Sequence, residues 1–181
     1  MTILLITTLL FAAALVPSQA LIAPLFALKV GDPFPSSALS KWGVKGKTSV
    51  LYFFGADDAP SCKKENSLFS ARLSEFGVPV VGVRNAKGAK GADVAQKLVI
   101  DEDDEVREEI GIKKDLFGLL GGRETYVVDS KGTVQMVFND QFKPEKHVEL
   151  ALDAVSELKA SSGSSKGGFD IGELLGGLLK K

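Results

Sequence analysis

Cysteine and histidine are scarce in this 181-residue chain, where each occurs once, as Cys62 and His147. A single thiol excludes an internal disulfide, and one cysteine with one histidine makes a structural zinc site implausible. The formal net charge of −1 gives no support for nucleic-acid binding, which usually needs a basic face. Hydrophobic residues make up 45% of the chain and charged residues 25%. These fractions exclude global disorder and predict one globular domain with extensions.

Charged side chains are missing before Lys29. The stretch 3–16 is mostly apolar, and Pro17-Ser18-Gln19-Ala20 follows it like a break and an A-x-A cleavage site. We therefore expect a signal or targeting segment at 1–20, followed by an apolar connector at 21–28. The alternative is an anchor, because residues 3–28 are long enough to cross a bilayer of ~30 Å.

A signal segment makes the lone cysteine unusual, because the secretory route favours paired cysteines. Either the thiol has a function, or the protein travels beyond the oxidising lumen. We expect entry into the secretory route, with a final destination in the chloroplast of an alga with a secondary plastid, or simple secretion or residence in the lumen.

Between residues 29 and 159, apolar strand patterns alternate with helical spacing, and we interpret this region as the main domain. The order of elements indicates βαβ units, which imply a parallel core, followed by an antiparallel hairpin that turns at Ser130-Lys131-Gly132. This order predicts a thioredoxin-like α/β/α sandwich with a central mixed sheet. The expected strands lie at 49–54, 78–83, 99–100, 124–129 and 133–138, and the expected helices at 60–76, 101–109 and 144–158, with a weak helix before 98. We interpret the acidic run 101–109 as a solvated helix face.

The C-terminal region differs in composition from the main domain. Residues 160–168 are rich in Ser, Gly and Lys, as in a flexible linker. Residues 169–181 form a short amphipathic element, in which three glycines each cost ~1 kcal/mol of helix propensity. We expect this element to order on a membrane surface or in a groove of a protein partner. The alternative is a frayed tail.

Cys62 lies where a strand pattern ends and a helical pattern begins. Pro60 suits the first turn of a helix, which places Cys62 in the same turn. The partial positive charge at a helix N-terminus favours thiolate over thiol. The pattern therefore indicates a reactive thiol, and the alternative is a small buried hydrophobic residue.

With these elements placed, the chain resembles the peroxiredoxins, specifically the peroxiredoxin Q / bacterioferritin-comigratory-protein group, from about residue 29 to 158. The resemblance implies reduction of hydrogen peroxide and organic hydroperoxides by a cysteine thiolate, with no metal and no organic cofactor. Its landmarks are V-G-D-P-F-P at 30–35, L-Y-F-F-G-A-D-D-A-P-S-C-K-K-E at 51–65, K-D-L-F-G-L-L-G-G-R-E-T-Y-V-V-D at 114–129 and F-N-D-Q-F-K-P-E-K-H-V at 138–148.

The resemblance implies that Cys62 is the reactive cysteine and that Arg123 stabilises its thiolate and the developing charge. The alternative for Arg123 is a surface salt bridge. Two motif positions differ from the family: Gly55 replaces a proline, and Ala59 replaces a threonine whose hydroxyl orients the peroxide. Ser61 is a candidate substitute hydroxyl.

Many members of the group that this chain resembles carry a resolving cysteine five residues after the reactive one, and that position here is Ser67. Sulfenic acid on Cys62 would therefore have to be reduced by an external thiol, either glutathione or a thioredoxin-like protein. We interpret His147 as a solvent-side or capping histidine. The leading hypothesis is a one-cysteine peroxidase. The alternatives are a degenerate peroxiredoxin that senses redox state or binds a partner, and an inert structural thiol.

Overall fold

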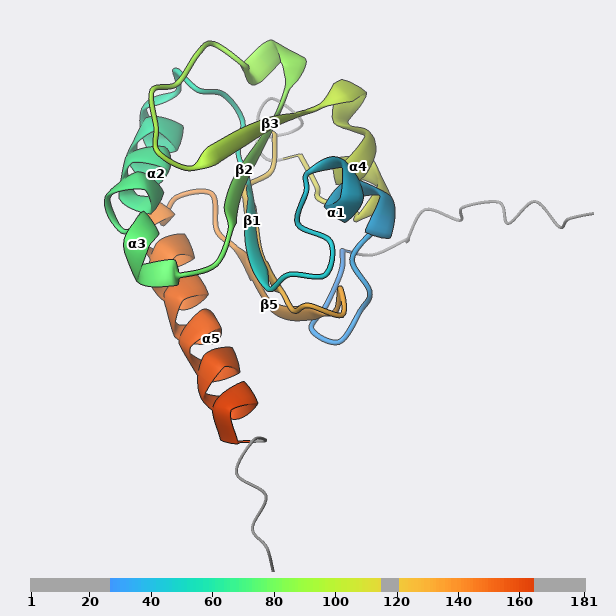
Figure 1. Ribbon diagram of the computed structural model, residues 1–181. Helices are drawn as coiled ribbons and strands as arrows, with labels where there is room; N and C mark the ends of the chain where they lie inside the picture. Colours follow the sequence, from blue (N-terminus) through green and yellow to red (C-terminus); the bar gives the residue numbers. More distant parts are fainter. Residues whose placement is uncertain (1–26, 115–120, 165–181) are drawn as a thin grey trace, which may run out of the picture.

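A five-stranded mixed sheet forms the centre of the domain (Figure 1). The structure is a computed structural model that describes residues 27–114 and 121–164. The predicted segments at 1–20 and 169–181 lie outside the described residues. None of the helices in the described part of the chain has the length and apolar character needed to span a membrane.

The sheet has the strand order β3-β2-β1-β4-β5. Strands β1, β2 and β3 run parallel to one another, whereas β4 and β5 pair in antiparallel fashion on the other side of β1. This arrangement confirms the predicted parallel core with a terminal hairpin. The strands span Ser49–Phe53 (β1), Val80–Asn85 (β2), Lys97–Asp101 (β3), Glu124–Val128 (β4) and Val134–Asn139 (β5).

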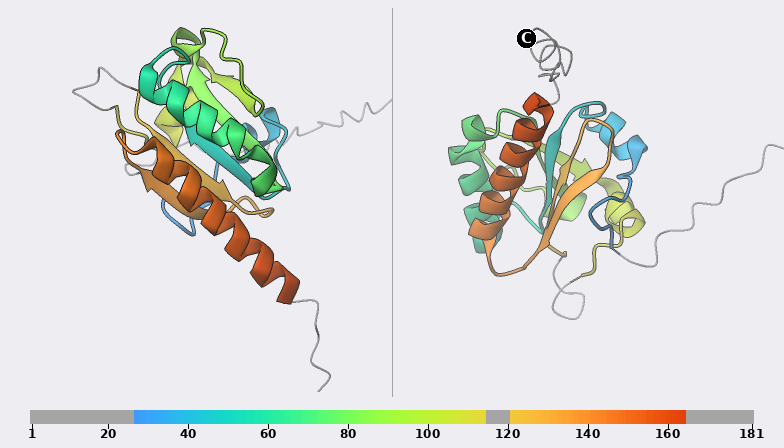
Figure 2. Two further views of the ribbon diagram at one scale, coloured as in Figure 1. Left: turned by 90° about the vertical axis from the view of Figure 1, so that its left-hand side faces the viewer. Right: turned by 90° about the horizontal axis from the view of Figure 1, so that it is seen from below.

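Helices cover both faces of the sheet, which confirms the predicted α/β/α sandwich. On one face lie α2 (Pro60–Ala71), α3 (Leu73–Phe76) and the long helix α5 (Pro144–Ser164) (Figure 2). On the other face lie α1 (Ser36–Lys41) and α4 (Glu105–Glu109). Two short 3-10 helices, η1 (Ala86–Gly88) and η2 (Glu102–Asp104), connect the elements near the ends of the parallel strands.

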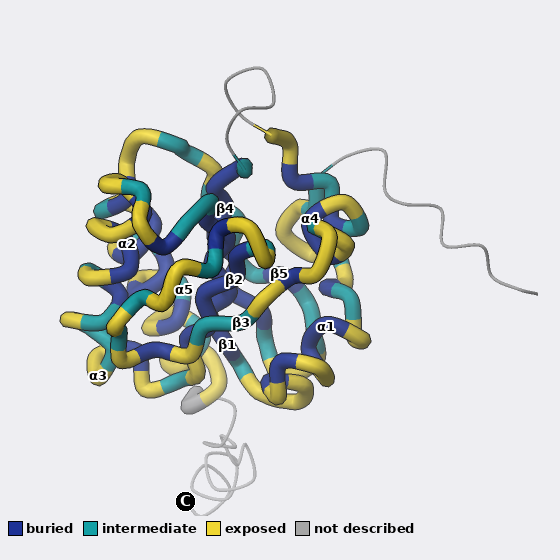
Figure 3. The backbone as a smooth tube through the Cα atoms, turned by 90° about the horizontal axis from the view of Figure 1, so that it is seen from above, coloured by how far each residue is buried: buried dark blue, intermediate teal, exposed yellow. Residues whose placement is uncertain are grey.

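Strand β1 lies at the centre of the sheet and is buried along its whole length (Figure 3). Successive strand residues point to opposite faces, and β1 supplies apolar side chains to both. Leu51 and Phe53 belong to the core with α1 and α4, whereas Val50 and Tyr52 belong to the core with α2 and α5. Gly82 leaves room for the Tyr52 ring, because a Cβ at Gly82 would lie 2.5 Å from it.

Several element boundaries differ from the sequence predictions. The expected helix 60–76 is interrupted at Arg72, which separates α2 from α3. The short helix α1 lies outside the expected elements, and its buried Leu39 belongs to the same core as Trp42. Helix α5 continues to Ser164, so the first half of the expected linker 160–168 is helical.

The weak helix expected before residue 98 does not form. Three of its backbone N–H groups bind side chains instead: Lys90 N and Gly91 N donate to Asp57 Oδ2, and Ala95 N donates to Ser70 Oγ. Side-chain acceptors of this kind compete with helical hydrogen bonding.

Candidate active site

Cys62 lies in the first turn of α2, after the loop that follows β1. Ala59 is the N-cap of this helix, and Pro60 is its first residue. The Cys62 side chain is free and buried, with 3% of its surface exposed. The sequence prediction for this turn is therefore confirmed: the sulfur lies at the N-terminus of a helix, where unpaired N–H groups favour a negative charge.

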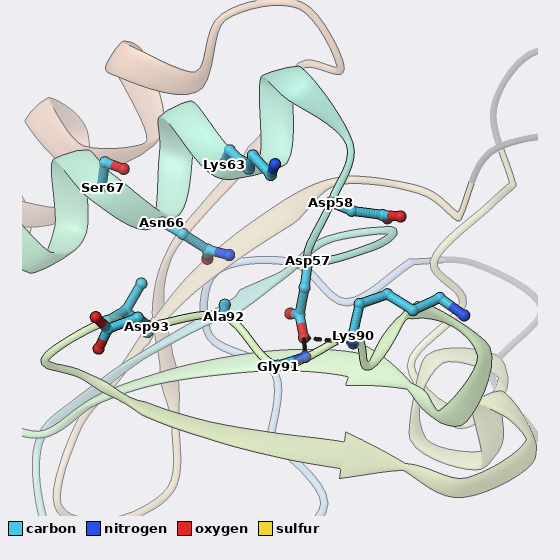
Figure 4. Close-up of a pocket in the computed structure, with 10 residues that line it drawn as sticks. Asp57, Asp58, Lys63, Asn66, Ser67, Lys90, Gly91, Ala92 and Asp93 are labelled. Carbon is cyan, nitrogen blue, oxygen red and sulfur yellow. Dashed lines mark hydrogen bonds between the residues drawn. The ribbon is translucent and has the colours of Figure 1, made fainter.

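Asp57 holds the loop between β1 and α2 in place through hydrogen bonds and an ion pair (Figure 4). Its Oδ2 accepts hydrogen bonds from Lys90 N at 2.8 Å and Gly91 N at 3.0 Å, and its Oδ1 lies 3.2 Å from Arg84 Nε. The Asp57 side chain is almost fully buried. The sequence suggested only a loop here, because Asp57 and its exposed neighbour Asp58 look alike in sequence.

A second contact holds the same loop. Asp57 N donates to Gly88 O at 2.8 Å. A Cβ at Gly88 would lie only 2.1 Å from Gly55 O, so a side chain at this position would push the loop away. Gly55 itself is not crowded, since a Cβ there would meet only Gly121 O, at 3.9 Å.

Arg123, the residue directly before β4, approaches the sulfur. Its Nη2 lies 3.4 Å from Cys62 Sγ and donates to Ser61 Oγ at 3.0 Å, while its Nε lies 3.2 Å from Glu65 Oε2. Arg123 and Glu65 are both fully buried. The alternative of a surface salt bridge is therefore wrong, and Arg123 is a buried cation in contact with the thiol.

Behind Arg123, Glu65 lies near His147, which is also fully buried. His147 Nδ1 is 3.7 Å from Glu65 Oε1 and 2.8 Å from Thr125 Oγ1, and His147 Nε2 is 2.9 Å from Asp140 O. The prediction of a solvent-side or capping histidine is wrong, because His147 is fully buried and both of its ring nitrogens pair with groups outside α5. The sequence did not reveal Glu65 as a site residue, since K-K-E resembles an exposed helix face.

Burial sets the protonation of this pair. It raises the pKa of Glu65 to about 8, against the opposing attraction of Arg123 and Arg107. Burial also lowers the pKa of His147 to about 4, helped by the nearby Arg123 cation. His147 is therefore neutral at pH 7 and acts there as a hydrogen-bonding group rather than a cation.

A second buried arginine, Arg107, holds the backbone around the site. It donates to Gly122 O at 2.7 Å, to Val83 O at 3.2 Å and to Phe54 O. Burial lowers the pKa of Arg107, and carboxylates led by Asp104 oppose this effect. The interpretation of 101–109 as only a solvated face is wrong, because Asp101, Val106 and Arg107 are buried.

A cavity of about 430 Å³ opens over Cys62. Ala59 and Ser61 lie in its wall beside the sulfur, so the structure places these two sequence-predicted positions at the thiol, together with Gly55. The remaining lining residues are Ala56, Asn85, Lys87, Gly88, Asp104, Lys114, Gly121 and Gln141.

Ser67 faces a different hollow. It lies further along α2 and lines a cavity of about 350 Å³ with Lys63, Asn66 and Lys90, and Cys62 does not line this cavity (Figure 4). Five residues along a helix correspond to a turn of about 140°. Ser67 therefore does not share the face of α2 that carries the thiol. Within residues 27–114 and 121–164, no group of three or more His, Cys, Asp or Glu side chains is placed to hold a metal ion.

Comparison with known proteins shows which family the chain is similar to. The AhpC/TSA family model matches residues 21–137. Chloroplastic peroxiredoxin Q of Sedum lineare is 42% identical over 145 residues, which cover 75% of this chain and 76% of the relative. Chloroplastic peroxiredoxin Q of Triticum aestivum is 39% identical over 150 residues, which cover 78% of this chain and 68% of the relative.

Solved structures show the same likeness. The peroxidoxin BcpB of Mycobacterium tuberculosis is 26% identical, with a TM-score of 0.58, covering 72% of this chain and 97% of that one. Peroxiredoxin Q of Xanthomonas campestris is also 26% identical, with a TM-score of 0.52, covering 61% and 79%. The family match covers more than half of the chain and includes both Cys62 and Arg123. The chain therefore belongs to the AhpC/TSA family and, within it, to the peroxiredoxin Q group of thiol peroxidases.

Proposed function

We propose that this chain is a one-cysteine peroxidase that reduces hydrogen peroxide or organic hydroperoxides through Cys62. The observation that carries the proposal is the position of Arg123 Nη2, 3.4 Å from Cys62 Sγ at the start of a helix. A guanidinium and a helix N-terminus together stabilise a thiolate, which is the nucleophilic form of cysteine.

In the proposed reaction, the thiolate attacks one peroxide oxygen, the O–O bond breaks, and Cys62 becomes a sulfenic acid. The other oxygen leaves as hydroxide or alkoxide and takes a proton to give water or an alcohol. The negative charge that develops along the S–O–O axis lies within reach of the Arg123 guanidinium. Donors placed where charge develops lower the barrier most.

Ala59 has no hydroxyl with which to bind the peroxide, and Ser61 is the nearest substitute. Ser61 Oγ accepts a hydrogen bond from Arg123 Nη2, which leaves the Ser61 proton free to donate. We propose that this proton binds the sulfur or the peroxide oxygen and replaces part of the missing contact.

Turnover needs a thiol from outside the chain, because Cys62 is the only cysteine in the sequence. Glutathione and a thioredoxin-like protein are the two candidates for the reductant. The relatives from Sedum lineare and Triticum aestivum are chloroplastic proteins, and we propose that residues 1–20 direct this chain to a plastid through the secretory route, with secretion as the alternative. A fluorescent fusion of residues 1–30 distinguishes plastid from extracellular delivery.

A second candidate function is a redox-sensing or binding module with little peroxidase activity. It is favoured by Ala59, an N-cap that makes no side-chain hydrogen bond. This candidate would use residues 169–181 for contact with a membrane or protein. Liposome flotation with and without residues 160–181 tests that role, and equal flotation of the two forms would remove it.

The peroxidase proposal is tested by stopped-flow oxidation of the recombinant chain with hydrogen peroxide. We expect Cys62 to react at least about 10²-fold faster than free cysteine thiolate, and Arg123→Lys to lose most of this advantage because a lysine lacks the planar fork. Cys62→Ser is the blank. A wild-type rate no faster than free thiolate would reject the peroxidase and leave the second candidate.

A further inference from the structure

We propose that the cavity over Cys62 selects its reductant by charge, and that the reductant is a small thiol that carries carboxylates, such as glutathione. This inference rests on the proposed peroxidase function. It assigns to Lys87 and Lys114 the role of attracting the thiol to the oxidised sulfur.

The two lysines line the cavity, and both are exposed. Lys87 belongs to η1, and Lys114 comes from the segment that follows α4. None of the ion pairs formed among the described residues involves either lysine. Within the described residues, both charges therefore face the cavity without an ion-pair partner.

Asp104 supplies the only carboxylate among the described residues of the cavity wall. Its Oδ1 lies 3.4 Å from Arg107 Nε, and Asn85 Nδ2 donates to both of its oxygens at 3.2 Å. The negative charge of Asp104 is thus engaged inside the wall. Among the described wall residues, two exposed lysines thus accompany one engaged carboxylate, and an excess of positive side chains raises the local concentration of anions.

Size favours a small thiol over a thiol on a folded protein. Cys62 is only 3% exposed and lines a cavity of about 430 Å³. This volume falls in the range of roughly 300–1,000 Å³ that is typical of small-molecule sites. A thiol on a protein surface would have to insert into the cavity, whereas a tripeptide thiol fits inside it.

The chemistry balances with two molecules of thiol. The first thiolate attacks the sulfenic sulfur of Cys62, an S–S bond forms as the S–O bond breaks, and hydroxide leaves to become water. The second thiolate attacks the sulfur of the bound small thiol, which releases the Cys62 thiolate and a symmetrical disulfide. The two external thiols supply the two electrons that reduce the sulfenic acid.

The test uses the full chain and the double variant Lys87→Gln/Lys114→Gln. The matched control is Lys45→Gln/Lys131→Gln, which removes the same charge from two exposed lysines beside the β4–β5 turn. This turn is at the opposite end of the sheet, because Val128 pairs with Ser49 at the start of β1. The sulfenic acid is formed with one equivalent of hydrogen peroxide, and mixed-disulfide formation is followed by rapid quenching and mass spectrometry.

Glutathione, mercaptosuccinate, neutral mercaptoethanol and cationic cysteamine are compared, each rate being expressed per thiolate. We expect the site variant to react about fivefold more slowly with the anionic thiols at low salt and within about twofold of wild type with mercaptoethanol. The difference between wild type and the site variant in their rates with anionic thiols should shrink in 0.5 M salt, where charges more than ~5 Å apart are screened. Equal slowing of anionic and neutral thiols, or no slowing in the site variant, would overturn the proposal. So would rapid reduction by thioredoxin with no charge preference among the small thiols.

A companion measurement separates this inference from the peroxidase function itself. The reduced Cys62 thiolate is reacted with anionic dithiobis(nitrobenzoate) and with neutral dithiodipyridine, and neither reaction uses peroxide. We expect the site variant to slow only the anionic reagent. If the site variant slows both reagents equally or slows neither, the charge proposal is wrong. If it slows only the anionic reagent but the wild-type chain reacts slowly with peroxide, the peroxidase function alone is rejected.

Discussion

Ala59 occupies the N-cap of α2, where its methyl group can bond neither to the helix nor to a peroxide. A threonine at this position would offer a hydroxyl to both the first turn of the helix and the cavity. We expect Ala59→Thr to raise the rate of peroxide oxidation about 10-fold to 10²-fold, as expected for one positioned donor. We also expect it to stabilise the protein by about 0.5–2 kcal/mol through capping.

Stopped-flow kinetics and urea denaturation measure these two effects. Ala59→Val is the control, because valine has the shape of threonine without the hydroxyl. If the valine and threonine variants behave alike, the missing hydroxyl is not what limits the site.

For single residues, the sequence predicted the positions that depend on a local pattern. The strand and the proline before Cys62 placed it in the first turn of a helix, and the family resemblance placed Arg123 beside it. Glu65 and His147 were not recognised, because their burial depends on packing between α2, β4 and α5. A carboxylate beside two lysines looks the same in sequence whether it faces water or an arginine.

Among the elements, the loop between β1 and α2 depends on Asp57 for its position. We expect Asp57→Asn to lower the free energy of unfolding by about 1–3 kcal/mol, because the buried carboxylate pairs with Arg84 and accepts two backbone hydrogen bonds. Oxidation of Cys62 should slow at the same time, since this loop forms part of the cavity wall.

Urea denaturation checks the stability change. The neighbouring Asp58 is exposed, so Asp58→Asn should stay within about 0.5 kcal/mol of wild type. Similar losses at the two positions would show that Asp57 does not anchor the loop.

The elements that the sequence predicted well are those with a strong periodic pattern. Strand β1 and the β4–β5 hairpin lie close to their predicted limits, because apolar runs and a turn signal mark them. The segment before β3 was predicted wrongly, since its backbone donors bind Asp57 and Ser70, which are distant in sequence. Side-chain acceptors supplied by another element leave no local signal.

For the whole molecule, the shifted pKa values of Glu65 and His147 predict that stability is level over a middle range of pH and falls on both sides of it. His147 titrates near pH 4 when folded against an ordinary value of 6.5. The unfolded chain therefore binds the extra proton first, and stability falls as the pH drops from 6.5 toward 4. Glu65 titrates near pH 8 when folded against 4.5. The folded state therefore holds the extra proton, and stability falls as the pH rises from 4.5 toward 8.

The two effects oppose each other between about pH 4.5 and 6.5, so thermal unfolding midpoints should be nearly level there and decline outside. Glu65→Gln should remove the decline of the unfolding midpoint on the alkaline side, and His147→Gln should remove the decline on the acidic side. Thermal unfolding followed by circular dichroism across this range measures both. An alkaline decline that persists in Glu65→Gln would assign that side of the profile to another group.

The position of Ser67 also bears on how the molecule moves during turnover. A disulfide joins residues whose Cα atoms lie within about 7 Å, whereas five residues along a helix already rise about 7.5 Å and turn to another face. A second thiol at Ser67 could be used only by unwinding α2. Without one, the helix can stay wound in the reduced and oxidised states alike. Amide hydrogen exchange in α2 should therefore be equally slow before and after oxidation, and the buried Glu65 and Asn66 can keep their places throughout the cycle.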